Sequence, residues 1–158
     1  ACMSPMSAFQ ILQGLETLSL RMDRHVSNTV QLVEFLAAHP LVQSVNYPGL
    51  AQHPDYALGQ RLMPRGVGAV FTLTLQGGRR AGALFIEALE LFSHLANVGD
   101  AKSLVIHPAS TTHHRMDEQA LAAAGIGEGL VRISVGLEDP VDLINDLGKA
   151  LRSVEKRL

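Results

Sequence analysis

The sequence predicts an α+β fold, in which a small antiparallel or mixed sheet is covered by helices on one face. The predicted elements follow the order helix, strand, strand, helix, strand, helix, strand, helix, without the strict strand–helix repeat of a parallel fold. Two stretches, Val67–Leu75 and Leu130–Asp139, alternate apolar and polar residues, as strands with one buried face do. The second face of the sheet is expected to be open or covered by a partner.

A long helical pattern opens the chain. Ser4 is a good N-cap and Pro5 suits the first helical position, and apolar residues then recur every three or four positions to Ala38. At 1.5 Å per residue such a helix is on the order of 50 Å long, more than a domain of this size requires. Either its first half contacts something outside this chain, or the helix is broken near Gly14 or His25.

The middle of the chain alternates extended and helical patterns. We expect a strand at Val42–Tyr47, a loop with at least one helical turn at Leu50–Arg65, the strand Val67–Leu75, a helix at Arg80–Leu91 and a strand near Ser103–His107.

Two further helices follow in the last third of the chain. The first has Asp117 as its cap and Gly125 as its stop signal. The second has Asp139 as its cap with Pro140 behind it, and it ends in basic residues that suit the negative end of the helix dipole.

Composition narrows the class of protein. The 158 residues are about one domain's worth, with 47% apolar and 18% charged residues. A net charge of −2 and the lack of a basic run argue against nucleic-acid binding, and no apolar run reaches the length of a membrane span. Cys2 is the only cysteine, which favours a reducing, cytoplasmic setting. The start at Ala1 fits either methionine removal or a cut from something longer.

Common chemical signatures are missing. His107, His113 and His114 lie close together, but no cysteine or carboxylate spacing supports a metal site, and no metal is expected. The glycine run Gly125–Gly129 leads from a helix into a strand, the reverse of a phosphate-binding loop. Cys2 has no histidine partner in the pattern and is not expected to be catalytic.

Arg132 is the residue that most invites a functional interpretation. Val131, Ile133 and Val135 alternate with Arg132, so a strand that buries the apolar residues turns the guanidinium to the other face. An arginine on a rigid strand suits two-pronged binding of a carboxylate or phosphate. The alternative is that Arg132 lies on a solvated face or pairs with Glu138 or another acid.

Three segments carry a resemblance to a known family: Gly14–His25, Asn97–His113 and Arg132-Ile-Ser-Val-Gly-Leu-Glu-Asp139. In this order they resemble the C-terminal domain of the pyridoxal-phosphate enzymes of Cys/Met metabolism, over nearly the whole chain. The stretch His94–Leu104 is more similar to the O-acetylhomoserine sulfhydrylases than to the cystathionine synthases and lyases, which usually have a serine where Asn97 stands.

The resemblance implies a fold like the C-terminal domain of fold-type I pyridoxal-phosphate enzymes. It also implies a substrate-binding role for Arg132, which would grip the α-carboxylate of an amino-acid substrate, with Asn97 and Thr112 flanking that carboxylate. The reaction would be γ-replacement of acetate on O-acetylhomoserine by sulfide or methanethiol. The family further implies a homo-oligomer, a tetramer built from dimers.

The chain departs from the family in what it lacks. Lys102, Lys149 and Lys156 are its only lysines, none in the context of the lysine that binds the cofactor, and no phosphate cradle is visible. We therefore expect residues 1–158 to be a single C-terminal domain without the N-terminal cofactor-binding domain, inactive alone and with no cofactor bound. The alternatives are a non-catalytic binding or oligomerisation module, or a fragment of a cystathionine γ-synthase or γ-lyase.

Overall fold

The computed structural model describes residues 2–158 and contains, in these residues, one mixed five-stranded sheet. Its spatial order is β1-β2-β5-β4-β3, and all neighbours are antiparallel except β3 and β4, which are parallel. The strands are β1 (Val42–Asn46), β2 (Val70–Leu75), β3 (Ser93–His94), β4 (Leu104–Ile106) and β5 (Leu130–Ser134). The expected α+β class with a small mixed sheet is confirmed.

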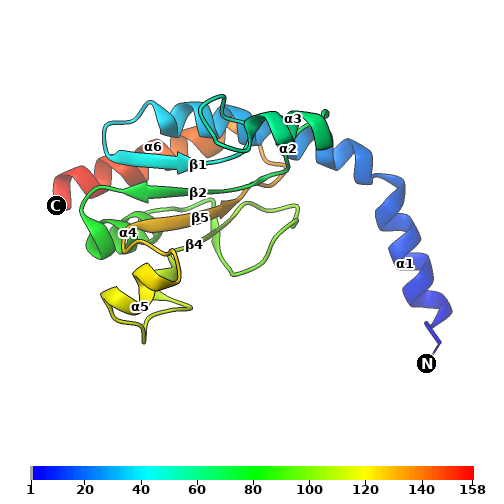
Figure 1. Ribbon diagram of the computed structural model, residues 1–158. Coiled ribbons are helices and arrows are strands. Elements are labelled where there is room, and N and C mark those ends of the chain that lie inside the picture. The colour runs from blue at the N-terminus through cyan, green and yellow to red at the C-terminus, as the bar shows by residue number, and fades with distance from the viewer. Residues whose placement is uncertain (1) are drawn as a thin grey trace.

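Three helices, α2, α4 and α6, supply the side chains that cover one face of the sheet. The helices are α1 (Pro5–Glu16), α2 (Leu18–Ala37), α3 (Tyr56–Leu62), α4 (Gly78–Glu87), α5 (Glu118–Ala123) and α6 (Pro140–Arg157), with a short 3-10 helix, η1, at Pro108–Ser110. Figure 1 shows α1 projecting away from the body that the other elements form. No helix within residues 2–158 is both long enough and apolar enough to span a bilayer.

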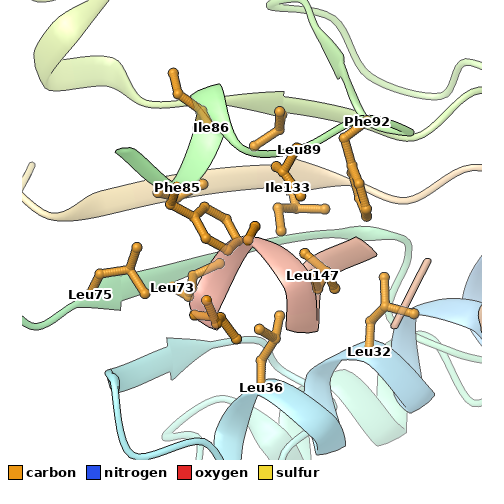
Figure 2. Close-up of a cluster of buried hydrophobic side chains, with 14 of the residues drawn as sticks. Leu32, Leu36, Leu73, Leu75, Phe85, Ile86, Leu89, Phe92, Ile133 and Leu147 are labelled. Atoms are coloured by element: carbon orange, nitrogen blue, oxygen red, sulfur yellow. The ribbon is translucent and has the colours of Figure 1, made fainter. Parts of the chain in front are cut away.

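The core lies between these helices and the sheet. Figure 2 shows Phe85 of α4 and Leu147 of α6 facing the strand residues Leu73 and Ile133, and all four are buried. On β2, Phe71, Leu73 and Leu75 are buried while the threonines between them are half-buried, which confirms the predicted alternation. Burial of this apolar surface is the main favourable term that holds the layers together.

The first helical pattern is two helices rather than one rod. Thr17 has φ −108° and ψ 7°, outside the helical range, and separates α1 from α2. The break leaves carbonyl groups of the last turn of α1 without helical partners, and Arg21 Nη2 donates to one of them, the Gly14 oxygen, at 2.9 Å. The expected break near Gly14 is therefore confirmed, and no residue of α1 is buried.

Two boundaries differ from the predictions for physical reasons. The predicted helix Arg80–Leu91 ends at Glu87, because the buried carboxylate of Asp146 accepts hydrogen bonds from the N–H groups of Glu90 and Leu91 at 2.9–3.2 Å. The two-residue strand β3 that follows was not predicted.

The start of β2 also lies later than predicted. The predicted strand Val67–Leu75 begins only at Val70, since Gly66 and Gly68 take positive φ angles of 130° and 89°. The hydroxyl of Tyr47 donates to the Gly68 oxygen at 2.9 Å and fixes this irregular segment. The predicted caps, by contrast, are confirmed: the side chains of Ser4, Asp117 and Asp139 each accept a backbone N–H at the start of a helix.

Candidate functional site

The candidate site lies on the sheet face opposite the helices. The strand register places Thr72 of β2, Arg132 of β5 and Ile106 of β4 side by side in one row. Side chains directly opposite on neighbouring strands share a face, so this row belongs to the face that the core does not use. Thr72 and Arg132 are half-buried. The predicted orientation of Arg132 away from the core is therefore confirmed.

The guanidinium of Arg132 is held by the main chain rather than by an acid. Its Nη2 donates to the carbonyl oxygen of Asn97 at 3.2 Å, and it makes no ion pair within residues 2–158. The alternative of a pair with Glu138 is wrong, because both carboxylate oxygens of Glu138 accept hydrogen bonds from Ser103. Its other guanidinium N–H groups have no hydrogen-bond acceptor within residues 2–158.

Part of this face is covered by the chain itself. The loop of residues 97–103 crosses it, and Gly99 N–H donates to Ser134 Oγ at 3.3 Å. Ser134 and Leu104, cross-strand neighbours on this face, are buried. The expectation of a face left open or covered by a partner is therefore correct at Thr72 and Thr74, which are half-buried, but wrong at the loop end.

A cavity of about 410 Å³ lies next to the Arg132 row. It is bordered by Ile106, the cross-strand neighbour of Arg132, and by Ala96, which precedes Asn97. Thr112 also lines it, and the Thr112 hydroxyl is hydrogen-bonded to Nδ1 of His113 at 2.8 Å. The other lining residues are Ile86, His94, Leu95, Val105 and Thr111. Of the three predicted site residues only Thr112 lines this cavity, while Arg132 and Asn97, which contact each other, do not.

His107 supports the wall of this region. It is fully buried; its Nε2 lies 2.7 Å from the Glu128 carbonyl oxygen and its Nδ1 2.7 Å from the Ser110 hydroxyl. A carbonyl only accepts, so Nε2 carries the proton and Nδ1 accepts from Ser110. Burial lowers the pKa of His107 below its ordinary value, and the nearby Arg79 acts in the same direction. His107 is therefore a neutral structural residue at the turn into η1.

This lowered pKa predicts a pH dependence of stability. Since the unfolded chain binds the proton more readily, the contribution of His107 is fully present above the ordinary pKa of 6.5 and is lost as the pH falls toward the lower folded value. Urea unfolding at about pH 5 and about pH 8 should show a smaller pH effect in His107→Gln than in the unaltered chain. Equal pH effects in both proteins would contradict this.

Two contacts near the site have no signal in the sequence. Ser103 and Glu138 are hydrogen-bonded through both carboxylate oxygens although they lie 35 positions apart. Asn28 of α2 donates to the carbonyl oxygens of Gly136 and Glu138 from more than 100 positions away. Neither pair belongs to a periodic pattern or a motif spacing, so only the fold could bring them together.

A comparison with solved structures identifies the class of this fold. A crystal structure of cystathionine gamma synthase from Xanthomonas oryzae pv. oryzae, in complex with aminoacrylate and cysteine, matches 98% of this chain and 40% of its own with a TM-score of 0.88 and 42% identity. The fold is that of fold-type I pyridoxal-phosphate enzymes. The chain belongs to the Cys/Met metabolism PLP-dependent enzyme family, whose model matches residues 1–152.

The similarity to curated relatives agrees with this family assignment. An O-acetyl-L-homoserine sulfhydrylase of Leptospira meyeri is 49% identical over 152 residues, which are 96% of this chain and 34% of the relative. An L-methionine gamma-lyase of Pseudomonas putida is 47% identical over 153 residues, 97% of this chain and 38% of the relative. The chain thus spans little more than a third of the length of the curated relatives it matches.

The described residues do not by themselves fit the family's cofactor. Lys102 and Lys156 are exposed, and Lys149 lines a surface depression of about 460 Å³. That depression also contains Glu90, Asp142 and Asp146, and Lys149 Nζ lies 3.9 Å from Glu90 Oε2. Arg152 also lines the depression, so three carboxylates face two cationic side chains, and this excess of negative charge disfavours a phosphate group there. Within residues 2–158 no cluster of three His, Cys, Asp or Glu side chains suited to a metal ion is found.

Proposed function

We propose that this chain is the C-terminal, substrate-carboxylate-binding domain of a pyridoxal-phosphate enzyme of methionine and cysteine metabolism. One observation carries the proposal: Arg132 presents a guanidinium without an acidic partner in residues 2–158. Its cross-strand neighbour Ile106 borders a cavity of about 410 Å³. An unpaired, half-buried guanidinium on a strand is well suited to two parallel hydrogen bonds with a carboxylate. Family membership supplies the class of substrate, an amino acid.

The side chains have distinct roles in this proposal. Arg132 binds the α-carboxylate, and Asn97 and Thr112 flank it. Asn97 belongs to the loop whose carbonyl group holds Arg132, and Thr112 belongs to the cavity wall. When its carboxylate is fixed, the amino acid holds its Cα–H bond in a defined direction, and such positioning is a large part of catalysis. Pyridoxal phosphate, bound by the complete polypeptide, supplies the electron sink.

The reaction we propose is γ-replacement of acetate on O-acetylhomoserine by sulfide or methanethiol, giving homocysteine or methionine. The sulfhydrylase relative at 49% identity and the asparagine at position 97 support this choice. The methionine gamma-lyase relative at 47% identity and the cystathionine gamma synthase structure at 42% support the alternative of a γ-lyase or γ-synthase.

A substrate panel separates these reactions. The full polypeptide that contains this chain, loaded with pyridoxal phosphate, should form homocysteine and acetate from O-acetylhomoserine and sulfide. Cystathionine formed from the same substrate and cysteine would identify a γ-synthase, and methanethiol released from methionine alone would identify a γ-lyase. No turnover of any of these would favour the non-catalytic binding or oligomerisation module.

The exposed first helix supports the proposal that the whole protein has an N-terminal domain. Met6 and Phe9 are 66% and 58% exposed, and Ile11, Leu12 and Leu15 are also at least half exposed. A helix that is apolar on most sides is normally buried in a larger body. We propose that this helix contacts the N-terminal cofactor-binding domain, which would carry the lysine and the phosphate cradle, and that the whole protein is a homo-oligomer in the cytoplasm.

Covalent trapping tests whether the 158-residue chain binds the cofactor alone. We expect mixing with pyridoxal phosphate and borohydride to give only weak, scattered labelling of the three lysines, because none is enclosed with a phosphate-binding group. The full polypeptide under the same conditions is the control and should be labelled at one lysine outside this chain. Stoichiometric labelling of Lys102, Lys149 or Lys156 in the isolated chain would contradict the expectation.

A further inference from the structure

We propose that Glu138 is a positioning residue for the Arg132 carboxylate site and acts through the loop of residues 97–103. This inference rests on the proposed function and concerns the same site. Within residues 2–158 the side chain of Arg132 makes one hydrogen bond, from Nη2 to the carbonyl oxygen of Asn97 at 3.2 Å. The direction of the guanidinium therefore depends on where the loop places that carbonyl group.

Glu138 holds the far end of this loop with both oxygens. Its Oε1 accepts the Ser103 N–H at 2.6 Å, and its Oε2 accepts the Ser103 hydroxyl at 2.9 Å. Ser103 Oγ in turn accepts the N–H of Gly136 at 2.8 Å. Ser103 is fully buried, so water does not compete for these bonds, and bonds to a charged carboxylate are the stronger kind.

The loop and the turn of residues 135–138 are in direct contact. Leu137 N–H donates to the Ala101 oxygen at 2.8 Å. A Cβ added at Gly136 would lie 2.3 Å from Glu138 Oε2 and 2.5 Å from the Ala101 oxygen, closer than real Cβ contacts. Because there is no space between the two segments, a displacement at Glu138 passes to the loop.

The other side of the turn is fixed by α2. Asn28 Nδ2 donates to the Gly136 oxygen at 3.1 Å and to the Glu138 oxygen at 2.9 Å. His25 Nδ1 lies 2.6 Å from the Val135 oxygen, and both side chains are buried. The turn is thus anchored to a helix, and the Glu138 side chain extends that anchor to the loop that orients Arg132.

The consequence is a specific effect on the carboxylate end of the substrate. Without the Glu138 side chain, Ser103 loses two hydrogen bonds and the loop is free to shift the Asn97 carbonyl. Arg132 remains present but is no longer held in one direction, so its two-pronged contact weakens. KM for an amino-acid substrate should rise more than kcat falls.

The test compares O-acetylhomoserine with its α-carboxamide analogue in the full, cofactor-loaded enzyme. The readout is the ratio of kcat/KM for acid over amide, which does not depend on the fraction of active enzyme. Arg132→Ala should collapse this ratio. Glu138→Ala should lower it about tenfold, as expected for lost hydrogen bonds to a charged group. In the double variant, Glu138→Ala should lower it no further, because both changes act through one guanidinium.

Conservative and control variants complete the design. Glu138→Gln keeps one acceptor for the Ser103 N–H, and Ser103→Ala keeps that N–H but loses the hydroxyl bond. Each should lower the ratio about threefold, less than Glu138→Ala, as expected for one lost hydrogen bond. Both variants therefore remain informative if Glu138→Ala does not fold. Glu155→Ala, an exposed site on α6, should leave the ratio unchanged.

The outcomes separate this inference from the proposed function. The positioning role alone is overturned if the ratio collapses in Arg132→Ala but is unchanged in Glu138→Ala, with no change in KM. If Glu138→Ala is not obtained, an unchanged ratio and KM in both Glu138→Gln and Ser103→Ala have the same meaning. A ratio unchanged in Arg132→Ala overturns the proposed function and this inference with it.

Discussion

Arg132→Ala should weaken transition-state binding of the amino-acid substrate by about 2–5 kcal/mol, which is roughly a 30- to 4,000-fold loss of kcat/KM. The expectation follows from the proposed pairing of the half-buried Arg132 with the substrate carboxylate. Removing one partner leaves the other charge desolvated and unpaired, which costs more than the pair contributes net. Steady-state kinetics of the full, cofactor-loaded polypeptide measures this directly.

Two companion variants show whether the loss is specific. Arg132→Lys keeps the charge but not the planar fork, so it should recover only part of the activity. Arg61→Ala removes an exposed arginine at the end of α3 and should have no effect. An Arg132→Ala enzyme as active as the unaltered one would remove this residue from the site.

Phe85→Ala should destabilise the 158-residue chain by about 3–5 kcal/mol, the usual cost of emptying a fully buried phenylalanine site. Phe85 has no exposed surface and lies in the centre of the layer formed by α4, α6 and the sheet, as Figure 2 shows. Because its neighbours come from several elements, they cannot all move to fill the space. Urea unfolding followed by circular dichroism gives the free energy of unfolding.

The chain contains a matched control for this change. Phe9 on α1 is 58% exposed, so Phe9→Ala should alter the free energy of unfolding of the isolated chain by less than about 0.5 kcal/mol. In a longer polypeptide whose N-terminal domain covers α1, the same change should become costly. An equal cost for Phe9→Ala and Phe85→Ala in the isolated chain would contradict the arrangement of α1 and the core.

Elements with a local signal were predicted well. The caps at Asp117 and Asp139 place the starts of α5 and α6 correctly, because a capping side chain and its partner N–H lie two or three residues apart. The alternation on β2, and on β5 as far as Ile133, reports burial directly, since successive side chains of a strand point to opposite faces.

Boundaries set by distant groups were missed. The end of α4 depends on the carboxylate of Asp146, more than fifty positions away. The start of β2 depends on two left-handed glycines and on the hydroxyl of Tyr47. A pattern read along the chain contains no information about such partners, and helix and strand ends are where they act.

Features of the candidate site were likewise predictable only where their signal is local. By itself the sequence determined the class of fold, the one-sided burial of β2, and the face to which Arg132 points, because strand periodicity and caps are properties of neighbouring residues. Only the tertiary structure decided that Glu138 binds Ser103 and leaves Arg132 without an acid within residues 2–158. The choice of partner for a charged side chain depends on distances between remote segments, which exist only once the sheet and its loops have been assembled.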